Sequence, residues 1–526
     1  MRPSFLGFET QKRTLQVAQK SMDITGNNVS NTNTMGYTRQ RVDLYAMYIS
    51  GNKSLRWTSN TNNLSLTGQG VNAYGVSQIR DIYIDKRYRE NVAIEAETDK
   101  SINVLSDIED VLDNFDTEGL QYFTEQFFSA MQDYSVEKPD SSEVATITVN
   151  SAVNLCRLLN DYDAQLREVE DTYVGELEGT IDYVNSLCEQ INKLNIRIDR
   201  EKINYPDEYG PNELYDEINM MIDELATYGN IEVTQHPSGT FSVKMGGIQL
   251  IDGEKFRTDR LIMRDYDEYN QAIMYFESGA ELNLNSGVLK SYDNMINGNG
   301  VYATGHQNGS YGIAYFKSAI NEFANTLAKV FNTANGGDED PSRRMFTAQT
   351  VDPLTGLITE TDAVVINAGN IRVTSAWTEN PTMIGQVRSV DPATGMYVYG
   401  YDEHTDSLGN VTLQNTNVIY LVDQLKNPDI AFGNAHDFRG SFHEYISFVS
   451  NRLGQTIQYE QSRYDAAQTT VDTLLDARDD VSGVELDEEG INMLNYQKWY
   501  SASSRIVTAL DDLLEKLINS TGRVGL

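Results

Sequence analysis

The chain has 526 residues, of which 40% are hydrophobic and 10% aromatic, and its formal net charge at pH 7 is −36. This length predicts about three domains, and the apolar content excludes a chain that is disordered throughout. The strong negative charge disfavours nucleic acid and anionic membranes as partners, because both are bound through basic surfaces.

Residues 5–31 are predicted to form a helix with one narrow apolar seam. The apolar residues that define this seam recur every seven positions: Phe8, Leu15, Met22 and Val29. A helix with so narrow a stripe needs a partner. The first residues lack the apolar run of a cleaved secretory signal, so an exported protein would leave by another route. We find no apolar stretch of roughly 18 residues, so membrane insertion is not expected.

A polar stretch follows from Asn27 to about Val76, with glycines typical of turns. Helical spacing returns near Ile84, and the apolar residues Ile102, Leu105, Ile108, Leu112 and Phe115 mark one face of a predicted helix. After Pro139, apolar residues at steps of three and four predict a single long helix over 155–198, and the two helices are expected to form a hairpin. Cys156 and Cys188 lie on this helix about 48 Å apart, so they are not expected to form a disulfide.

The middle of the chain alternates between helix and strand. A helix is predicted through residues 218–225, and a small β-meander over about 229–265, where the apolar period switches to two. Helix returns over 316–331 and ends before the Asn335–Pro341 breaker. Residues 342–440, rich in Thr, Val, Tyr and turn signals, are predicted to be an inserted, mostly β domain. A helix over about 441–481 follows.

Residues 484–518 are predicted to form a second helix with a coiled-coil seam. Its members step by threes and fours: Met493, Tyr496, Tyr500, Ser503, Val507, Leu510, Leu514 and Leu517. Residues 1–41 hold six basic and two acidic side chains, whereas residues 484–526 hold four basic and seven acidic ones. Opposite charges favour a meeting of the two terminal helices, within one subunit or between neighbours. The alternative is that each seam is simply buried in the chain's own core.

These elements predict an α+β multidomain protein. Residues 1–45 and 484–526 are expected to form a terminal coiled-coil assembly domain. Residues 46–341 and 441–483 are expected to form a helical core domain that includes the meander, and residues 342–440 the outer domain.

Motifs for catalysis, cofactors or metals are not apparent. The five histidines have no spacing of three or four residues, which a helical zinc face requires. Nucleophile-elbow and Walker motifs are missing, and Asp338-Glu339-Asp340 lacks the rest of a calcium loop. With 77 acidic residues, no carboxylate pair stands out as a glycosidase dyad. We therefore expect no catalytic, cofactor-binding or metal-binding residue, and no cofactor.

Two terminal segments resemble a known family. The first is Gly26-Asn27-Asn28-Val29-Ser30-Asn31-Thr32-Asn33-Thr34-Met35-Gly36-Tyr37-Thr38-Arg39-Gln40, and the second runs from Ser482 through Glu489 to Arg505. Together they resemble the paired signatures of the axial proteins of the bacterial flagellum, which include rod, hook and hook-associated proteins. Tyr37–Gln40 and Val484–Glu489 are most similar to the members that join hook to filament. Met35 departs from the proline that the family usually has there.

The resemblance implies a structural role without enzyme activity. The protein would be exported without a cleaved signal and would work outside the cell, in the flagellum. Implied partners are other copies of the chain, the hook protein, the next junction protein, an export chaperone and the flagellar type III export apparatus. The terminal helices would become ordered on assembly and line the channel. The predicted assembly residues are Phe8, Leu15, Met22, Val29, Met493, Tyr496, Tyr500, Val507, Leu510, Leu514 and Leu517.

The signature turn has a simpler role that is compatible with assembly. Asn, Thr and Gly residues stop a helix and turn the chain, because they cap helix ends and accept left-handed backbone. The turn residues singled out are Asn27, Asn28, Asn31, Gly36, Tyr37 and Arg39. We expect Tyr37, Arg39 and Arg41 to present a charged edge to an acidic neighbour.

Three alternatives remain open at this stage. A hook protein shares both signatures but has less helix before its β region. The junction protein next to the filament lacks this Asn-rich signature. An exported hydrolase or glycan-binding protein with flagellar-type ends would need its own site, and the tyrosines of residues 342–440 are the candidates for sugar stacking.

Overall fold

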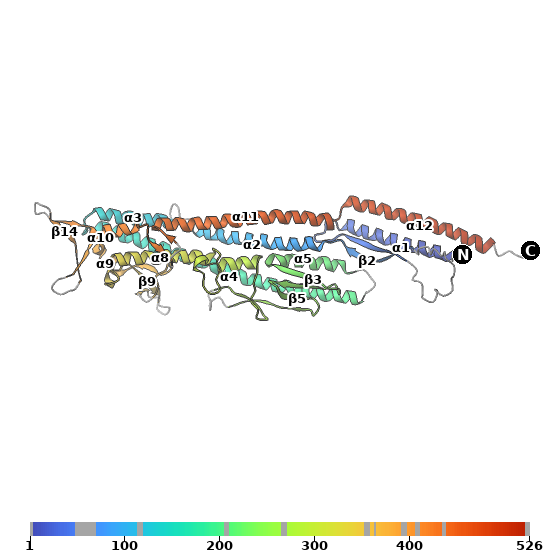
Figure 1. Ribbon diagram of the computed structural model, residues 1–526, viewed down its shortest axis with the longest axis horizontal. Coiled ribbons are helices and arrows are strands. Elements are labelled where there is room, and N and C mark those ends of the chain that lie inside the picture. The colour runs from blue at the N-terminus through green and yellow to red at the C-terminus, as the bar shows by residue number, and fades with distance from the viewer. Residues whose placement is uncertain are drawn as a thin grey trace, which may run out of the picture.

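The computed structural model describes residues 4–47, 70–112, 119–204, 210–264, 271–351, 358–361, 364–390, 397–405, 411–433 and 438–520. The molecule is a long rod (Figure 1). A pair of terminal helices forms one end, a bundle of long helices forms the middle, and small hairpins with short helices form the other end.

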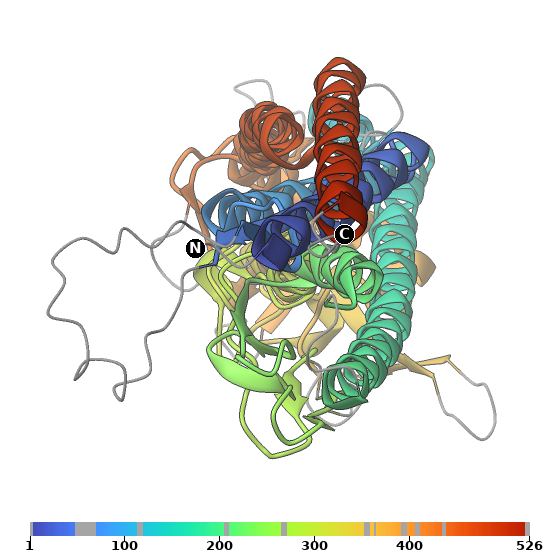
Figure 2. The same ribbon diagram turned by 90° about the vertical axis from the view of Figure 1, so that its right-hand side faces the viewer.

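The end that holds both termini contains three closely packed parts. Helix α1 (Ser4–Ser30) packs along α12 (Leu486–Ser520), and the β1–β2 hairpin packs against α1. Strands β1 (Gln40–Ala46) and β2 (Val71–Gln78) are antiparallel. Figure 2 looks onto this end and shows α1 beside α12. The hairpin lies in the stretch predicted to be irregular, so its two strands were missed.

Long helices with narrow apolar faces build the body. They are α2 (Ile82–Leu112), α3 (Leu120–Val136), α4 (Ser142–Asn204), α5 (Asn212–Tyr228) and α11 (Phe442–Ser482). Helix α4 contains the predicted 155–198 helix without interruption, and both cysteines are buried along it and free. Helix α11 packs along α2, and α3 lies against α4. A capping box at Ser441 and Glu444 begins α11.

The predicted meander is a four-stranded antiparallel sheet in the order β3-β4-β5-β6. Its strands are Ile231–Gln235, Phe241–Met245, Ile248–Asp252 and Arg257–Thr258. A second pair, β7 (Leu261–Met263) and β8 (Met274–Phe276), follows. Two helices, α7 (Val288–Ile296) and α8 (Ile313–Ala334), then return to the body and pack on α4. One continuous apolar core therefore joins the meander to the helices.

Residues 342–440 form small sheets with two helices at the far end of the rod. A three-stranded sheet has the order β10-β9-β11, and three hairpins pair β12 with β13, β14 with β15 and β16 with β17. The strand bounds are Phe346–Val351, Ile358–Thr361, Ile371–Val373, Val387–Val390, Tyr397–Gly400, Asp402–Thr405, Val411–Gln414, Ala431–Phe432 and Phe438–Arg439. Helices α9 (Ser375–Glu379) and α10 (Thr416–Leu425) bury Trp377 and Leu421 against the body.

Within the described helices we find none that is both long and apolar enough to span a membrane. The described residues also contain no group of three or more side chains arranged to hold a metal ion.

A buried pair of glutamates lies between α2 and α11. Glu97 is 3% exposed and Glu460 8% exposed, and they share one cation, Arg463. Burial raises the pKa of both carboxyls, although the charge of Arg463 acts in the opposite direction. Lys290 on α7 also lowers the pKa of Glu97, but less than burial raises it. Among the described groups, Oε2 of Glu97 has no hydrogen-bond partner.

Glu97→Gln is therefore expected to stabilise the body at neutral pH. The folded-state pKa of Glu97 lies above that of the unfolded chain, so its contribution is most favourable below the ordinary value of about 4.3 and is lost as pH rises through the raised value. Removing the buried charge should raise the free energy of unfolding at pH 7 by about 1 kcal/mol. Thermal unfolding at pH 4 and pH 7 measures this, with exposed Glu109→Gln as the control. An equal gain at both pH values would contradict it.

Candidate assembly site

The terminal helices run antiparallel in one chain and meet along a thin seam. At the outer end of the seam, a Cβ built on Gly7 lies 3.6 Å from Cδ1 of Leu510. At the end next to the body, Asn28 bonds to Glu489. Residues 7–28 and 489–510 each span three heptads, so the two contacts define a single register. The partner that each predicted helix required is thus the other end of the same chain.

The seam on α1 differs from the predicted one. Phe8 and Val29 are exposed, and Leu15 and Met22 are only half-buried. The buried side chains of α1 are instead small or polar: Val17, Ala18, Ser21, Thr25 and Asn28. The apolar heptad positions therefore lie beside the buried face of α1, because three of its five buried residues are polar and do not contribute to an apolar pattern.

The seam on α12 agrees more closely with the spacing. Ser503 is buried, and the half-buried residues beside it are Met493, Tyr496, Val507, Leu510 and Leu514. Tyr500 is partly exposed at 41%. Leu517 is exposed because α12 continues past the start of α1, as Figure 1 shows.

Asn28 is the centre of a buried polar cluster that closes the seam. Its Oδ1 accepts hydrogen bonds from the hydroxyl of Tyr37 (2.8 Å) and the backbone N–H of Gln40 (3.1 Å). Its Nδ2 donates to the carbonyl of Gln40 (2.9 Å) and to Glu489 (3.2 Å). All four hydrogen-bonding positions of the amide are therefore used. Burial, followed by nearby carboxylates, raises the pKa of Tyr37.

Arg39 ties the N-terminal signature to the C-terminal one. Its Nε lies 2.8 Å from Glu489 and its Nη1 2.8 Å from Glu488. Its backbone N–H donates to the carbonyl of Ser482, the last residue of α11 (2.9 Å). Burial alone would lower the pKa of Arg39, but its bonds to both glutamates raise it overall. Glu489 is 2% exposed, so its charge depends on Arg39 and Asn28 for compensation.

The predicted acidic neighbour of this edge belongs to the same chain. Arg39 contacts Glu488 and Glu489, whereas Arg41 is exposed and lies 3.5 Å from Asp43. Neither glutamate was predicted from the sequence as a site residue, although both lie inside the C-terminal signature. The sequence offered one indication of this contact. The N-terminal signature contains one basic residue, and the C-terminal signature contains adjacent acidic residues.

The signature turn also rests on the body. Gly36 has φ +78°, a backbone conformation that favours glycine, and an added Cβ would meet the side chain of Met220 on α5, which would have to move. Gln78 donates to Asp216 (2.8 Å) and to the carbonyl of Asn212 (2.9 Å) on α5. The terminal pair is thus fixed to the body through α5 as well as through α11.

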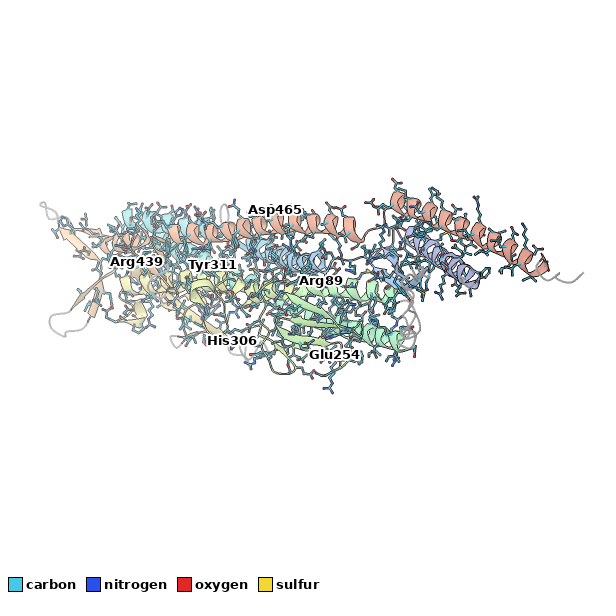
Figure 3. The ribbon with its side chains drawn as sticks, turned by 45° about the vertical axis from the view of Figure 1, so that its right-hand side comes forward. Arg89, Glu254, His306, Tyr311, Arg439 and Asp465 are labelled. Atoms are coloured by element: carbon cyan, nitrogen blue, oxygen red, sulfur yellow. The ribbon has the colours of Figure 1, made fainter. Side chains whose placement is uncertain are left out.

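An ionic network continues from this contact into the body. Asp85 pairs with Arg80 and Arg478, each at 3.0 Å, and Arg478 also pairs with Asp223 at 2.7 Å. Arg89 adds a 2.6 Å contact to Asp223. Figure 3 labels Arg89 within the body and Asp465 on the outer side of α11. The network joins α2, α5 and the end of α11 beneath the terminal pair.

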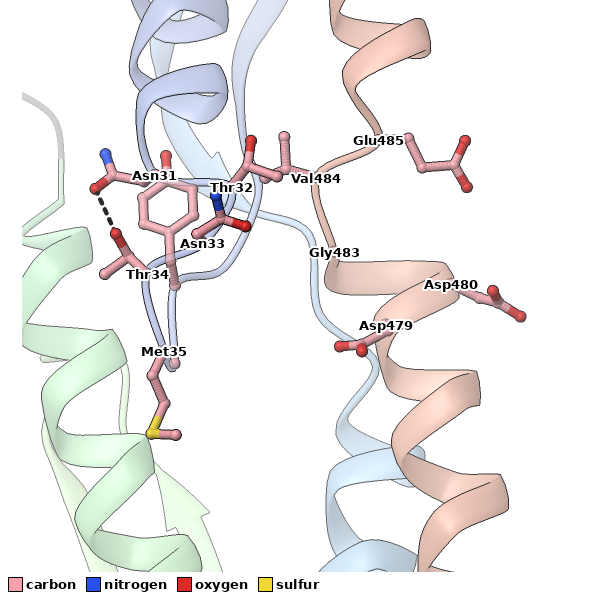
Figure 4. A pocket seen from close by; sticks show the side chains of 12 residues that line it. Asn31, Thr32, Asn33, Thr34, Met35, Asp479, Asp480, Gly483, Val484 and Glu485 are labelled. Atoms are coloured by element: carbon pink, nitrogen blue, oxygen red, sulfur yellow. Dashed lines mark hydrogen bonds between the residues drawn. The ribbon is translucent and has the colours of Figure 1, made fainter.

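An open groove of about 600 Å³ lies between the signature turn and the link from α11 to α12. Figure 4 shows Asn31, Thr32, Asn33 and Thr34 on one side and Asp479, Asp480 and Glu485 on the other. Asn31 accepts a hydrogen bond from Thr34 (3.1 Å) and bonds back to Asn27 (3.0 Å), so these amides hold the turn itself. These bonds hold the signature turn, which forms one wall of the groove opposite the link between α11 and α12.

Comparison with known proteins finds matches at both ends and in the body. Residues 8–38 match the flagella basal body rod protein family, and residues 480–520 match the C-terminal family of flagellar basal body rod FlgEFG proteins. Residues 105–342 match the helical domain of flagellar hook-associated protein FlgK. The first match contains Asn28 and the second contains Glu489, whereas Arg39 lies one residue beyond the first match. The bond between Asn28 and Glu489 therefore joins the two matched regions.

Similar proteins of comparable length exist in other bacteria. Flagellar hook-associated protein 1 of Bacillus subtilis is 28% identical, covering 99% of this chain and 99% of that protein. The protein of the same name from Escherichia coli is 22% identical, covering 96% and 98%. The structure of the flagellar hook junction protein FlgK from Burkholderia pseudomallei aligns with a TM-score of 0.54 at 12% identity, over 76% of this chain and all of that one. That likeness shows a shared fold.

Proposed function

The chain belongs to the flagellar hook-associated proteins, and from this premise we propose that its closed terminal helices build the layer that joins hook to filament. It is a structural component of the bacterial flagellum. The observation that supports the mechanism is the buried contact of Asn28 and Arg39 with Glu489, which turns two ends of the sequence into one assembling unit.

Neighbouring copies are proposed to pack on the apolar surface that the closed pair leaves open. Trp499, Ile506 and Leu513 recur every seven residues on α12, beside the seam, and are 48%, 45% and 61% exposed. On α1, Phe8 and Val29 are also exposed. A contiguous exposed apolar stripe typically marks a protein–protein contact. In this arrangement Val507, Leu510 and Leu514 hold the pair together, and the flanking stripes contact neighbours.

The wider partners follow from the family. We propose that the layer stacks on the hook protein and receives the next junction protein. Before assembly, an export chaperone and the flagellar type III export apparatus would carry the chain to its place outside the cell. The terminal helices α1 and α12 become fully ordered only on assembly, because the thin seam between them buries few large apolar side chains. In this role the protein needs no enzyme activity and no cofactor.

The main alternative is a hook protein with the same terminal signatures. The long helical body argues against it, because residues 105–342 match the helical domain of a hook-associated protein. No specific contact among the described residues of 342–440 favours a glycan-binding role for the tyrosines there.

Deletion of the gene tests the proposed position in the flagellum. We expect cells with hooks but without filaments, and flagellin in the culture medium, measured by electron microscopy and immunoblotting. A plasmid copy should restore filaments. Loss of the hooks themselves would place the protein lower in the axis, and intact filaments would contradict the junction role.

A further inference from the structure

We propose that Asn28 determines the register in which α1 packs on α12. Its partner Glu489 lies on the same heptad stripe as Tyr496, Ser503 and Leu510, and Asn28 itself shares a stripe with Gly7, Thr14 and Ser21. The two stripes face each other, as the contacts of Gly7 with Leu510 and of Asn28 with Glu489 show. Asn28 is therefore a buried polar residue at one end of a repeating contact, and its side chain bonds to the partner helix.

The rest of the seam does not distinguish one register from the next. Ser21 is buried but its hydroxyl has no hydrogen-bond partner among the described residues, and Thr14 bonds to the carbonyl of Thr10 on its own helix. Neither residue bonds to α12. A shift by one heptad moves α1 by about 10 Å and again opposes small residues of α1 to the same stripe of α12. Side-chain packing alone thus favours the observed register only weakly.

A shifted register breaks the bond between Asn28 and Glu489 or the bonds between Asn28 and Gln40. Glu489 would face Ser21 and lose Asn28, and Asn28 would separate from Gln40 or from Glu489. A buried carboxylate that loses its partners is strongly unfavourable, and a single buried Asn is known to select register in coiled coils. The cluster therefore supplies the specificity that the apolar seam lacks.

Chain connectivity does not by itself prevent a shift. Movement of α1 toward the body places Gly7 opposite Ser503 and stretches no segment, although it displaces the turn after Ser30 from its contact with α5 at Gly36. The bonds of Asn28 to Tyr37 and Gln40 close this turn in the observed register. The same side chain thus holds both the turn and the partner helix. Its importance for the flagellum rests on the proposed function, but the register itself is a property of one chain.

Cysteine crosslinking in the purified full-length protein reads the register directly. A cysteine at Gly7 is combined with one at Leu510 for the observed register, or with one at Ser503 or Leu517 for a shift by one heptad. Burial raises the pKa of the native thiols of Cys156 and Cys188, so they do not compete in oxidation. With Asn28 present, we expect the 7–510 product to exceed either shifted product at least tenfold.

Asn28→Ala is expected to abolish this preference, with the 7–503 product rising to a level similar to 7–510. Ser21→Ala, one heptad away on the same stripe, is the matched control and should keep the original preference. If Asn28→Ala still gives 7–510 alone, connectivity sets the register and the proposal is overturned.

If Asn28→Ala gives none of the three products, an asparagine placed at position 21 provides the test. In the double variant Ser21→Asn with Asn28→Ala, the new amide faces Glu489 only after the shift that brings residue 7 opposite residue 503. Recovery of the 7–503 product supports a register-determining asparagine, and failure to recover it overturns the proposal. Because these measurements need no flagella, their outcome is independent of the deletion phenotype.

Discussion

Leu510→Asp is expected to abolish filament growth while the body of the protein stays folded. Leu510 packs against the backbone of α1 at Gly7, where no side chain fills the space. A carboxylate there loses this contact and would be half-buried without a basic partner, at a cost of about 2–3 kcal/mol. The pair has no large buried core to offset this loss, so α1 and α12 should separate.

The measurement combines electron microscopy of cells that carry the variant with thermal unfolding of the purified protein. The main unfolding transition should match that of the wild type, because the body has its own continuous core. Thr508→Asp introduces the same charge at an exposed position two residues away, and should support normal filaments. Normal filaments in Leu510→Asp would show that the intrachain pair is dispensable for assembly.

Apolar periodicity predicted the long helices well, because each of them is stabilised by burial of an apolar face. Helix α4 buries Leu155, Tyr162, Leu177 and Ile191 at the expected spacing. It is longer at both ends than the predicted helix over 155–198. The switch to a period of two located the meander for the same reason. Where a hydrophobic face is buried, the sequence alone indicates the element.

Strands β1 and β2 escaped prediction because their residues are not sorted into a buried and a solvent face. Leu44 and Tyr45 are exposed, and Val76 is the deeply buried side chain of β2. The hairpin is held instead by its ladder, by packing against α1 and by the hydrogen bonds of Gln78 to α5. Polar residues such as Asn72 and Gln78 therefore hid the alternation that identifies a strand.

The candidate site was predicted in outline but not in its contacts. Composition and heptads indicated that the ends pair, and the family resemblance singled out Asn28 and Arg39. The role of Glu489 depends on a contact between residues 461 positions apart in the chain. Hydrophobic spacing cannot show such a contact, because a buried acid appears in the sequence like any surface acid until its partners are placed.

A second variant should separate the contact within the chain from the contact between chains. Ile506→Asp combined with Leu513→Asp replaces two exposed apolar residues beside the seam and leaves Leu510 and Asn28 in place. The 7–510 crosslink should therefore form as in the wild type. Incorporation should fail, because each neighbour contact would bury an unpaired carboxylate, which costs about 1–3 kcal/mol and is repeated in every copy of the layer.

We expect bare hooks, with the variant chain recovered from the culture medium. Ser501→Asp combined with Thr508→Asp adds the same two charges on the opposite, solvent-exposed face of α12, and should preserve filaments. If the Ile506 and Leu513 double variant assembles normally, neighbouring copies do not contact this stripe. The exposed residues of α1 are then the next candidates for the contact between subunits. If it loses the 7–510 crosslink, the stripe belongs to the pair itself. Only retained pairing together with lost incorporation assigns the two faces of α12 to separate tasks, closure within one subunit and contact with the next.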